Sequence, residues 1–283
     1  MTKANANSKK ARDLAKSSMI LCADDYGLST DVDQAILELA GSRRLTAVSC
    51  MVLLEKCTPK LLADLCAHES KLDIGLHLCL TDEGLPLSAA EDNPLKSKPL
   101  PVFGALLKRA LRGALPASEV ALQVSTQYAL FVKKCGRKPD YIDGHLHVHQ
   151  LPGARQGLLD FVHSLPAQAR PYIRNTEMPL SQLMRRRLPW LKSALIGFFG
   201  SRMSRQLRAA SIPTNSGFAG IYDFRRWNKY PVYFPRFIAC LSGSNGLLVV
   251  HPGHQEEWRQ QEFSTIKQFD FPPGLLTRFR YSS

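Results

Sequence analysis

The chain has 283 residues, of which 45% are hydrophobic and 22% charged, and its 37 basic and 24 acidic residues give a formal net charge of +13. This composition excludes collagen-like, disordered and low-complexity proteins, and no apolar run approaches the ~20 residues of a membrane span. A chain of this length can bury its apolar side chains in one α/β domain.

The first 16 residues form a basic segment. They carry five basic residues against Asp13, and the nearby apolar run 19–23 is shorter than the core of a signal peptide. We therefore expect residues 1–16 to be a disordered basic tail, and residues 17–283 to form a single folded domain of a cytoplasmic protein.

Four short apolar runs of strand length follow, and each ends in side chains capable of acid–base or metal chemistry. In chain order they are residues 19–23, which precede Asp24 and Asp25, residues 74–76, which precede His77, residues 141–142, which precede Asp143 and His145, and residues 247–250, which precede His251. Active sites of parallel sheets and (β/α) barrels lie at the carboxyl ends of the strands. We therefore expect these polar groups to share one edge of a sheet.

Helical patterns alternate with these runs. One covers residues 31–40, and another covers residues 118–134, with Ser118 as the expected N-cap and Gly136 just past the end. This alternation predicts a parallel sheet or a (β/α) barrel.

The seven cysteines are odd in number and show no CxxC spacing. This pattern predicts reduced, buried thiols in a cytoplasmic protein rather than a disulfide framework or a zinc cluster.

Residues 178–222 contain no acidic residue, and we predict an insertion or a lid there. Residues 184–208 alone hold seven basic residues, interleaved with bulky apolar ones. Such a segment is typical of a helix on an anionic membrane surface, and packing as a lid or as part of the core is the alternative. Because most of the charge lies in this segment and the tail, we expect no nucleic-acid partner.

The densest group of candidate ligands is Asp143 with three alternate histidines, His145, His147 and His149. If residues 145–149 continue as a strand, the three imidazoles share one face; if the chain turns after Gly144, only one or two reach the site. Neutral imidazole is a common metal ligand, so the group indicates a metal site, with a hydrogen-bonded histidine ladder as the alternative.

Asp24 and Asp25 add a carboxylate pair. Adjacent residues of a strand point to opposite sides, so both can face one point only if the chain bends, which the following Tyr26 and Gly27 permit. Two carboxylates fit hydrolysis, one binding a metal and the other taking a proton from water. A pair that caps the next helix is the alternative.

Four strings in this order resemble the YdjC-like carbohydrate deacetylases, which include the chitooligosaccharide deacetylases. They are ADDYGLS at 23–29, IGLHLCLT at 74–81, IDGHLHVHQLP at 142–152 and VVHPG at 249–253. The similarity covers roughly residues 17–255. It implies a single-domain, distorted (β/α) barrel of TIM-barrel-like form.

The resemblance also implies roles for individual residues. It implies one divalent ion, Mg²⁺ or Zn²⁺, held by Asp25, His77 and His145, with Asp24 as catalytic base and His251 as general acid. His147, His149 and Asp143 would support the ligands or contact substrate, and Arg174 and Phe218, the latter in a loop at 215–218, would lie in substrate-facing segments.

The resulting hypothesis is a metal-dependent hydrolase that removes the N-acetyl group from an amino sugar or oligosaccharide and releases acetate. Alternatives are a metallohydrolase for another amide or ester, an enzyme for a lipid-linked envelope sugar, and a non-catalytic binding protein, which the complete set of candidate residues disfavours. Expected partners are the N-acetylated sugar, a second copy in a homodimer, and the inner face of an anionic membrane through residues 184–208.

Overall fold

The structure is a computed structural model that describes residues 18–81, 84, 100–178, 180–189, 191–241 and 243–281. In this part of the chain, seven parallel strands form one sheet in the order β5-β4-β3-β2-β1-β7-β6. The strands are β1 (Met19–Tyr26), β2 (Ala47–Cys50), β3 (Asp73–Leu78), β4 (Tyr141–Gly144), β5 (Tyr172–Ile173), β6 (Gly217–Ala219) and β7 (Gly246–Val250). The four predicted apolar runs therefore lie in β1, β3, β4 and β7.

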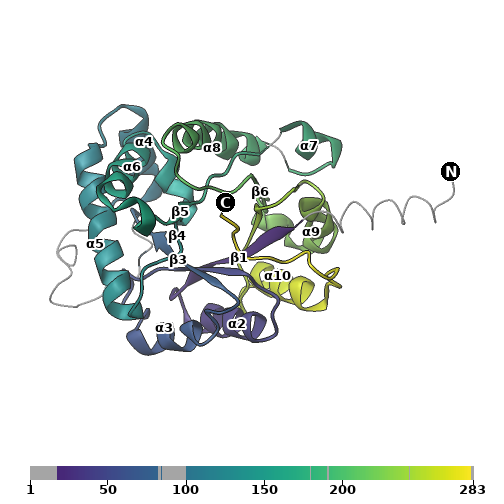
Figure 1. The fold of residues 1–283 in the computed structure, drawn as a ribbon. Coiled ribbons are helices and arrows are strands. Elements are labelled where there is room, and N and C mark those ends of the chain that lie inside the picture. Colours follow the sequence, from purple (N-terminus) through teal and green to yellow (C-terminus); the bar gives the residue numbers. More distant parts are fainter. Residues whose placement is uncertain are drawn as a thin grey trace.

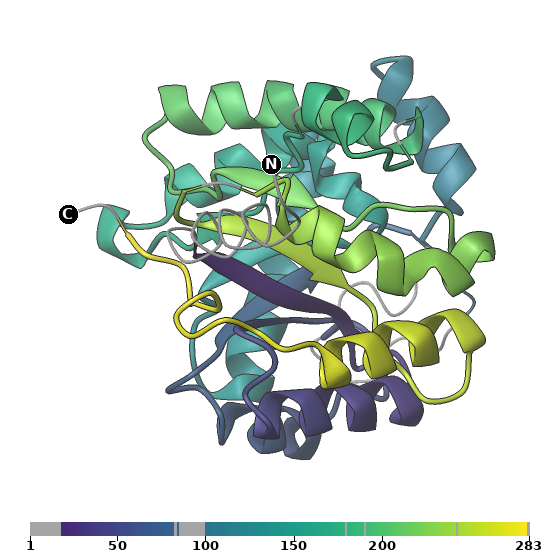
Figure 2. The same ribbon diagram turned by 90° about the vertical axis from the view of Figure 1, so that its right-hand side faces the viewer.

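Helices surround this sheet, as Figure 1 shows. They are α2 (Thr30–Gly41), α3 (Pro59–Cys66), α4 (Phe103–Leu111), α5 (Ala117–Cys135), α6 (Ala154–Ser164), α7 (Leu180–Arg185), α8 (Leu191–Ala209), α9 (Tyr230–Ile238) and α10 (Glu257–Gln268), with the 3-10 helices η1 (His145–Gln150), η2 (Ala167–Ala169) and η3 (Phe224–Lys229). Figure 2 shows α8 along one side of the molecule and α2 and α10 on the opposite side. The continuous sheet and its covering helices form one α/β domain.

The sheet curls until its two edge strands approach each other. Ile173 of β5 forms an isolated parallel bridge with Thr214, which lies just before β6, and the Ile173 N–H donates to the Pro213 carbonyl at 2.9 Å. The predicted distorted (β/α) barrel is thus confirmed, in the form of a strongly curled half-barrel.

Strand side chains alternate between the outside and the inside of this half-barrel. Leu21 and Leu248 are among those that face outward and pack in the larger apolar cluster. Ile20, Tyr141 and Leu247 are among those that face inward and form a smaller cluster. The inner face is the one that leads to the polar groups at the strand ends.

Helix α5 begins earlier than predicted. Ser118, the predicted N-cap, lies inside the helix, and Pro116 takes the N-cap position with an extended backbone. Proline suits a helix start because its missing N–H would have no helical partner there. The predicted end is confirmed, since Gly136 follows the helix with a left-handed φ of 72°.

Residues 178–222 are not one insertion. They contain α7, α8 and also β6, which pairs in parallel with β7 as part of the sheet. Helix α8 connects β5 to β6 and buries Met203 and Leu207. The insertion hypothesis is therefore wrong for β6, and the question of a lid or a surface contact concerns α7 and α8.

Two further predictions concern the termini and the thiols. Residues 1–16, the predicted tail, lie outside the described residues. All seven cysteines are free thiols, which confirms that they form no disulfide framework.

Among the described residues, no helix is both long and apolar enough to cross a bilayer.

Candidate metal and catalytic site

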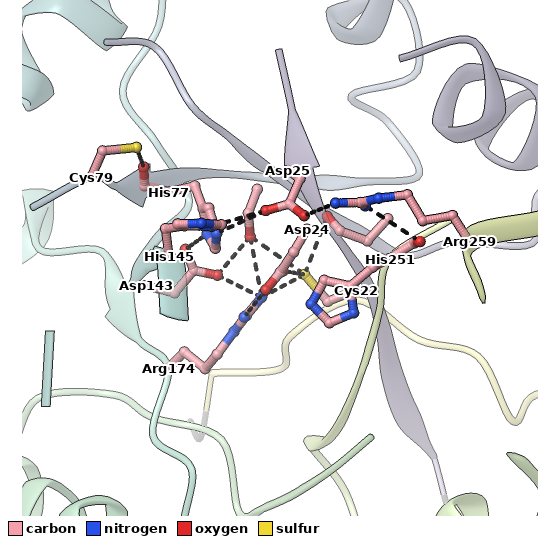
Figure 3. A network of polar contacts seen from close by, with 12 residues as sticks. Cys22, Asp24, Asp25, His77, Cys79, Asp143, His145, Arg174, His251 and Arg259 are labelled. Atoms are coloured by element: carbon pink, nitrogen blue, oxygen red, sulfur yellow. Dashed lines mark hydrogen bonds and ion pairs between the residues drawn. The ribbon is translucent and has the colours of Figure 1, made fainter. Parts of the chain in front are cut away.

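The predicted polar residues converge at the carboxyl ends of the strands (Figure 3). The alternation that turns Ile20 and Cys22 into the half-barrel turns Asp24 there as well, and it does the same for His77 in β3 and Asp143 in β4. Asp24, His77 and Asp143 are all buried. Residues far apart in the sequence thus form one interior polar cluster.

Asp25 joins this cluster because β1 bends at that residue. Its backbone is left-handed, with φ 74°, and the β1–β2 register shifts between Ala23 and Tyr26. The predicted bend is present, but it begins at Asp25 itself and continues through Gly27, which has φ 94°. A left-handed aspartate is strained, and such strain is typical of functional sites.

Asp25, His77 and His145 each offer a ligand atom within 4.8 Å of the others. Asp25 Oδ1 lies 3.5 Å from His77 Nε2 and 3.1 Å from His145 Nδ1. His77 Nδ1 contacts Asp143 Oδ1 at 2.7 Å, an arrangement that orients a metal-binding imidazole and directs Nε2 toward the ion. One carboxylate and two imidazoles form a donor set that fits a catalytic divalent ion.

The charges of the cluster favour a cation. Three buried carboxylates face two guanidinium groups, which leaves one negative charge in excess when the histidines are neutral. These groups are Asp24, Asp25 and Asp143 on one side and Arg174 and Arg259 on the other. Burial alone would lower the pKa of His77, but Asp143 and Asp24 raise it to about 10. The cluster therefore attracts positive charge at the position of the candidate ligands.

Arg174 clamps Asp24. Its Nη1 and Nη2 donate to the two carboxylate oxygens of Asp24 at 2.7 Å each, and Nη2 also donates to Ser49 Oγ at 3.1 Å. Burial opposes ionisation of Asp24, but Arg174 reverses this effect and holds the pKa of Asp24 below its ordinary value. Arg174 has no exposed surface, and its guanidinium group supports the Asp24 carboxylate.

A second group with metal-ligand spacing is Cys22, Asp24 and Asp143. The guanidinium of Arg174 contacts all three, with Nη2 at 2.9 Å from Cys22 Sγ and 2.5 Å from Asp143 Oδ2. The cation of this group is therefore the arginine itself.

Glu262 of α10 supports His251. The His251 backbone N–H donates to Glu262 Oε2 at 2.6 Å, and the Tyr222 hydroxyl donates to Oε1 at 2.9 Å. His251 Nδ1 lies 3.9 Å from Oε1. Burial raises the pKa of Glu262 to about 7 and lowers the pKa of His251 to about 4. Near neutral pH, the carboxyl group is the partner that holds a proton.

Arg259, also in α10, fixes the orientation of Asp25. Its Nη2 donates to Asp25 Oδ2 at 2.9 Å, and its Nε donates to Glu256 Oε2 at 2.7 Å. Because Oδ2 is engaged in this way, Oδ1 is the oxygen that faces His77 and His145.

The chain turns after Gly144, so the extended alternative for residues 145–149 is wrong. These residues belong to η1, and Leu146 and His147 have left-handed φ values of 52° and 59°. The turn separates the three histidines, and of the three, His145 belongs to the candidate ligand set.

The other two histidines have different surroundings. His149 is fully buried and donates from Nε2 to the Arg174 carbonyl at 2.9 Å. The ring of His147 stands edge-on to Phe218, with centroids 5.4 Å apart, and its buried Nδ1 has no partner among the described residues. Phe218 itself is buried and belongs to β6, so the predicted loop is wrong at this residue.

Sequence reasoning missed three members of the cluster, Ser49, Arg259 and Glu262. Ser49 had a signal, because it is a polar residue within the apolar run of β2. Arg259 and Glu262 stand three positions apart on one helix face beyond the last motif, and only the packing of α10 brings them to the site.

A sequence model of the YdjC-like proteins matches residues 18–272. The chain belongs to the YdjC-like family. It is 33% identical over 134 residues to the chitooligosaccharide deacetylase of Escherichia fergusonii, and 32% identical over 201 residues to the carbohydrate deacetylase of Mus musculus. The alignments cover 47% and 69% of this chain, and 51% and 60% of the two relatives. This YdjC-like chain thus spans about half to three-fifths of the length of the relatives it matches.

A solved structure shares the fold of this YdjC-like chain. It is a protein of Enterococcus faecalis named as a cellobiose-phosphate cleavage protein, with a TM-score of 0.63 and 17% sequence identity. The superposition covers 89% of this chain and 91% of the other. At this identity the likeness concerns the fold alone.

Proposed function

We propose that the chain is a metal-dependent hydrolase that removes the N-acetyl group from an N-acetylated amino sugar or oligosaccharide and releases acetate. The observation that carries this proposal is the convergence of a three-donor set with a carboxylate held by an arginine and a partly buried imidazole. The residues are Asp25, His77 and His145 with Asp24 and His251. The names of the two curated relatives support a carbohydrate substrate.

The reaction has to overcome the stability of an amide. A divalent ion held by Asp25, His77 and His145 would supply Lewis-acid activation of the acetyl carbonyl and of water. Two imidazoles and a carboxylate are typical ligands of Zn²⁺, whereas Mg²⁺ prefers oxygen ligands. Metal analysis of the purified protein distinguishes the two ions.

Asp24 is the proposed general base. Its lowered pKa keeps it ionised at neutral pH, and the two bonds from Arg174 fix the direction in which its oxygens point. A fixed carboxylate beside the donor set can take the proton from the attacking water.

His251 is the proposed general acid. With its pKa lowered to about 4 by burial, His251 is a neutral imidazole at neutral pH, so it acts as general acid by relaying a proton from a neighbouring group to the departing nitrogen. Glu262, whose pKa is raised to about 7, is the neighbouring group that holds a proton near neutral pH. The leaving amine is thereby protonated as the carbon–nitrogen bond breaks.

The proposal predicts that Asp24→Asn keeps bound metal but loses acetate release by about 10²–10⁴-fold, the usual effect of a general acid–base group. The measurement is acetate release from N-acetylated chito-oligosaccharides, with metal content determined on the same samples. Asp160→Asn, at an exposed position of α6, is the control and should keep wild-type turnover.

Two results would contradict this account. Full activity of Asp24→Asn would show that another group is the base. Hydrolysis of other amides or esters by the wild-type protein, without acetate release from any N-acetylated sugar, would show that the substrate class is wrong.

A further inference from the structure

Helix α8 has an inner and an outer face of different character. Met203 and Leu207 on the inner face are buried in the main apolar cluster. Leu195 and Phe198 on the outer face are 60% and 51% exposed. A helix that served only to cover the barrel would turn its largest apolar side chains inward, so the exposed pair indicates a contact surface.

The exposed apolar pair continues into exposed arginines. Spacings of three and four residues align Leu195, Phe198, Arg202 and Arg205 along one side of α8, and all four are exposed. We call these four residues the α8 stripe. The Arg202 guanidinium lies 3.7 Å from the centroid of the Phe198 ring, so the basic and apolar parts are in contact.

We propose that the α8 stripe docks the protein on the surface of an anionic lipid bilayer. Arginines complement the lipid phosphates, and Leu195 and Phe198 can enter the boundary between headgroups and acyl chains. The whole segment 184–208 has seven basic residues and no acidic one, which removes like-charge repulsion from such a surface. A nucleic-acid duplex would match the arginines but would leave the apolar pair without a partner.

The position of the α8 stripe relative to the candidate site bears on this proposal. Ser193, in the first turn of α8, donates to the carbonyl of Ile221, which follows β6, at 3.5 Å. The apolar half of the α8 stripe, Leu195 and Phe198, therefore lies toward the end of the sheet where the strands have their carboxyl ends, the end that carries Asp24 and His251. Figure 2 shows α8 on the side of the molecule opposite α2 and α10.

The test is flotation of the full chain with vesicles. We expect binding to vesicles rich in phosphatidylglycerol at about 50 mM salt, none to pure phosphatidylcholine, and strong weakening at about 500 mM salt, where screening is nearly complete. Arg202→Glu/Arg205→Glu should weaken binding about 30-fold or more, because each basic residue contributes about fivefold near an anionic surface.

The chain offers matched controls for charge and for apolar area. Lys60→Glu/Lys71→Glu makes the same charge change at exposed positions in and after α3 and should bind as wild type. Leu195→Ser should weaken binding about tenfold, whereas Leu122→Ser, at an equally exposed leucine of α5, should not.

The proposal fails if the wild-type chain does not float with anionic vesicles at low salt, or if both charge-reversal variants lose binding equally. It also fails if the protein binds a DNA duplex through Arg202 and Arg205 but not vesicles. Because flotation does not depend on turnover, these results are independent of those for the proposed deacetylation.

Discussion

At the scale of single residues, the decisive feature is how the buried charges are paired. Arg174 holds Asp24 and contacts Asp143, and Asp143 in turn contacts His77. Removing one member of such a buried set leaves an uncompensated charge and costs about 3–5 kcal/mol of stability. The same pairing gives the two adjacent carboxylates different roles. Arg174 holds Asp24, whereas Asp25 belongs to the donor set.

Glu262→Gln tests the buried carboxyl group behind His251. The pKa of Glu262 is raised from 4.5 to about 7, so between these pH values the folded state holds a proton that the unfolded state has lost. This residue therefore lowers the free energy of unfolding as pH rises through that window, by roughly 3 kcal/mol in total. Glutamine keeps an acceptor for the His251 N–H but cannot ionise.

The expected result is that Glu262→Gln becomes more stable relative to wild type as pH rises from 5 to 8, measured by urea denaturation at each pH. Glu257→Gln, at an exposed position of the same helix, should show no such trend. A constant difference between Glu262→Gln and wild type across this range would contradict the raised pKa.

At the scale of elements, the strand pair β3–β4 leaves no room for a side chain at one position. A Cβ on Gly75 would lie 2.3 Å from the ring of Tyr141. That ring cannot move freely, because it stacks on Tyr172 and its hydroxyl group bonds to Ser49 at 2.8 Å. Gly75 therefore allows β3 to lie close to the stacked rings of Tyr141 and Tyr172.

Gly75→Ala should lower the free energy of unfolding by about 3 kcal/mol, as overpacking of a filled core does. Gly104→Ala is the matched control, because no atom lies within 4 Å of its added Cβ and alanine favours the α4 helix. Denaturation midpoints of the two variants give the comparison. Equal stability of Gly75→Ala and wild type would show that Tyr141 has more freedom than its contacts indicate.

The strands and turns also show which parts of the fold could be predicted from the sequence. Continuous apolar runs of strand length predicted β1, β3, β4 and β7 and the shared polar edge, because burial on both faces leaves a strong signal in the composition of a strand. The left-handed backbone at Asp25, Leu146 and His147 could not be predicted, because only a few per cent of non-glycine residues adopt it and the surrounding fold imposes it at these positions. For this reason the extended alternative for the three histidines was wrong.

At the scale of the whole molecule, contacts from elements distant in the chain complete the site. Helix α10 returns to β1 and brings Arg259 and Glu262 to Asp25 and His251. No local sequence motif predicts these two residues, because their role depends on how α10 packs beside α2 and α9. The interior thus gathers buried ion pairs around the candidate site. By contrast, five arginines of segment 184–208 are exposed, namely Arg185, Arg187, Arg202, Arg205 and Arg208.

The central claim is that Asp25, His77 and His145 hold one divalent ion, and calorimetric titration of the metal-free protein with Zn²⁺ tests it most directly. Wild type and His147→Ala should bind one ion per chain, whereas His145→Ala, two positions away in the same turn, should bind about 100-fold more weakly or not at all. Binding by His145→Ala that equals wild type, or no binding by wild type, would contradict the account.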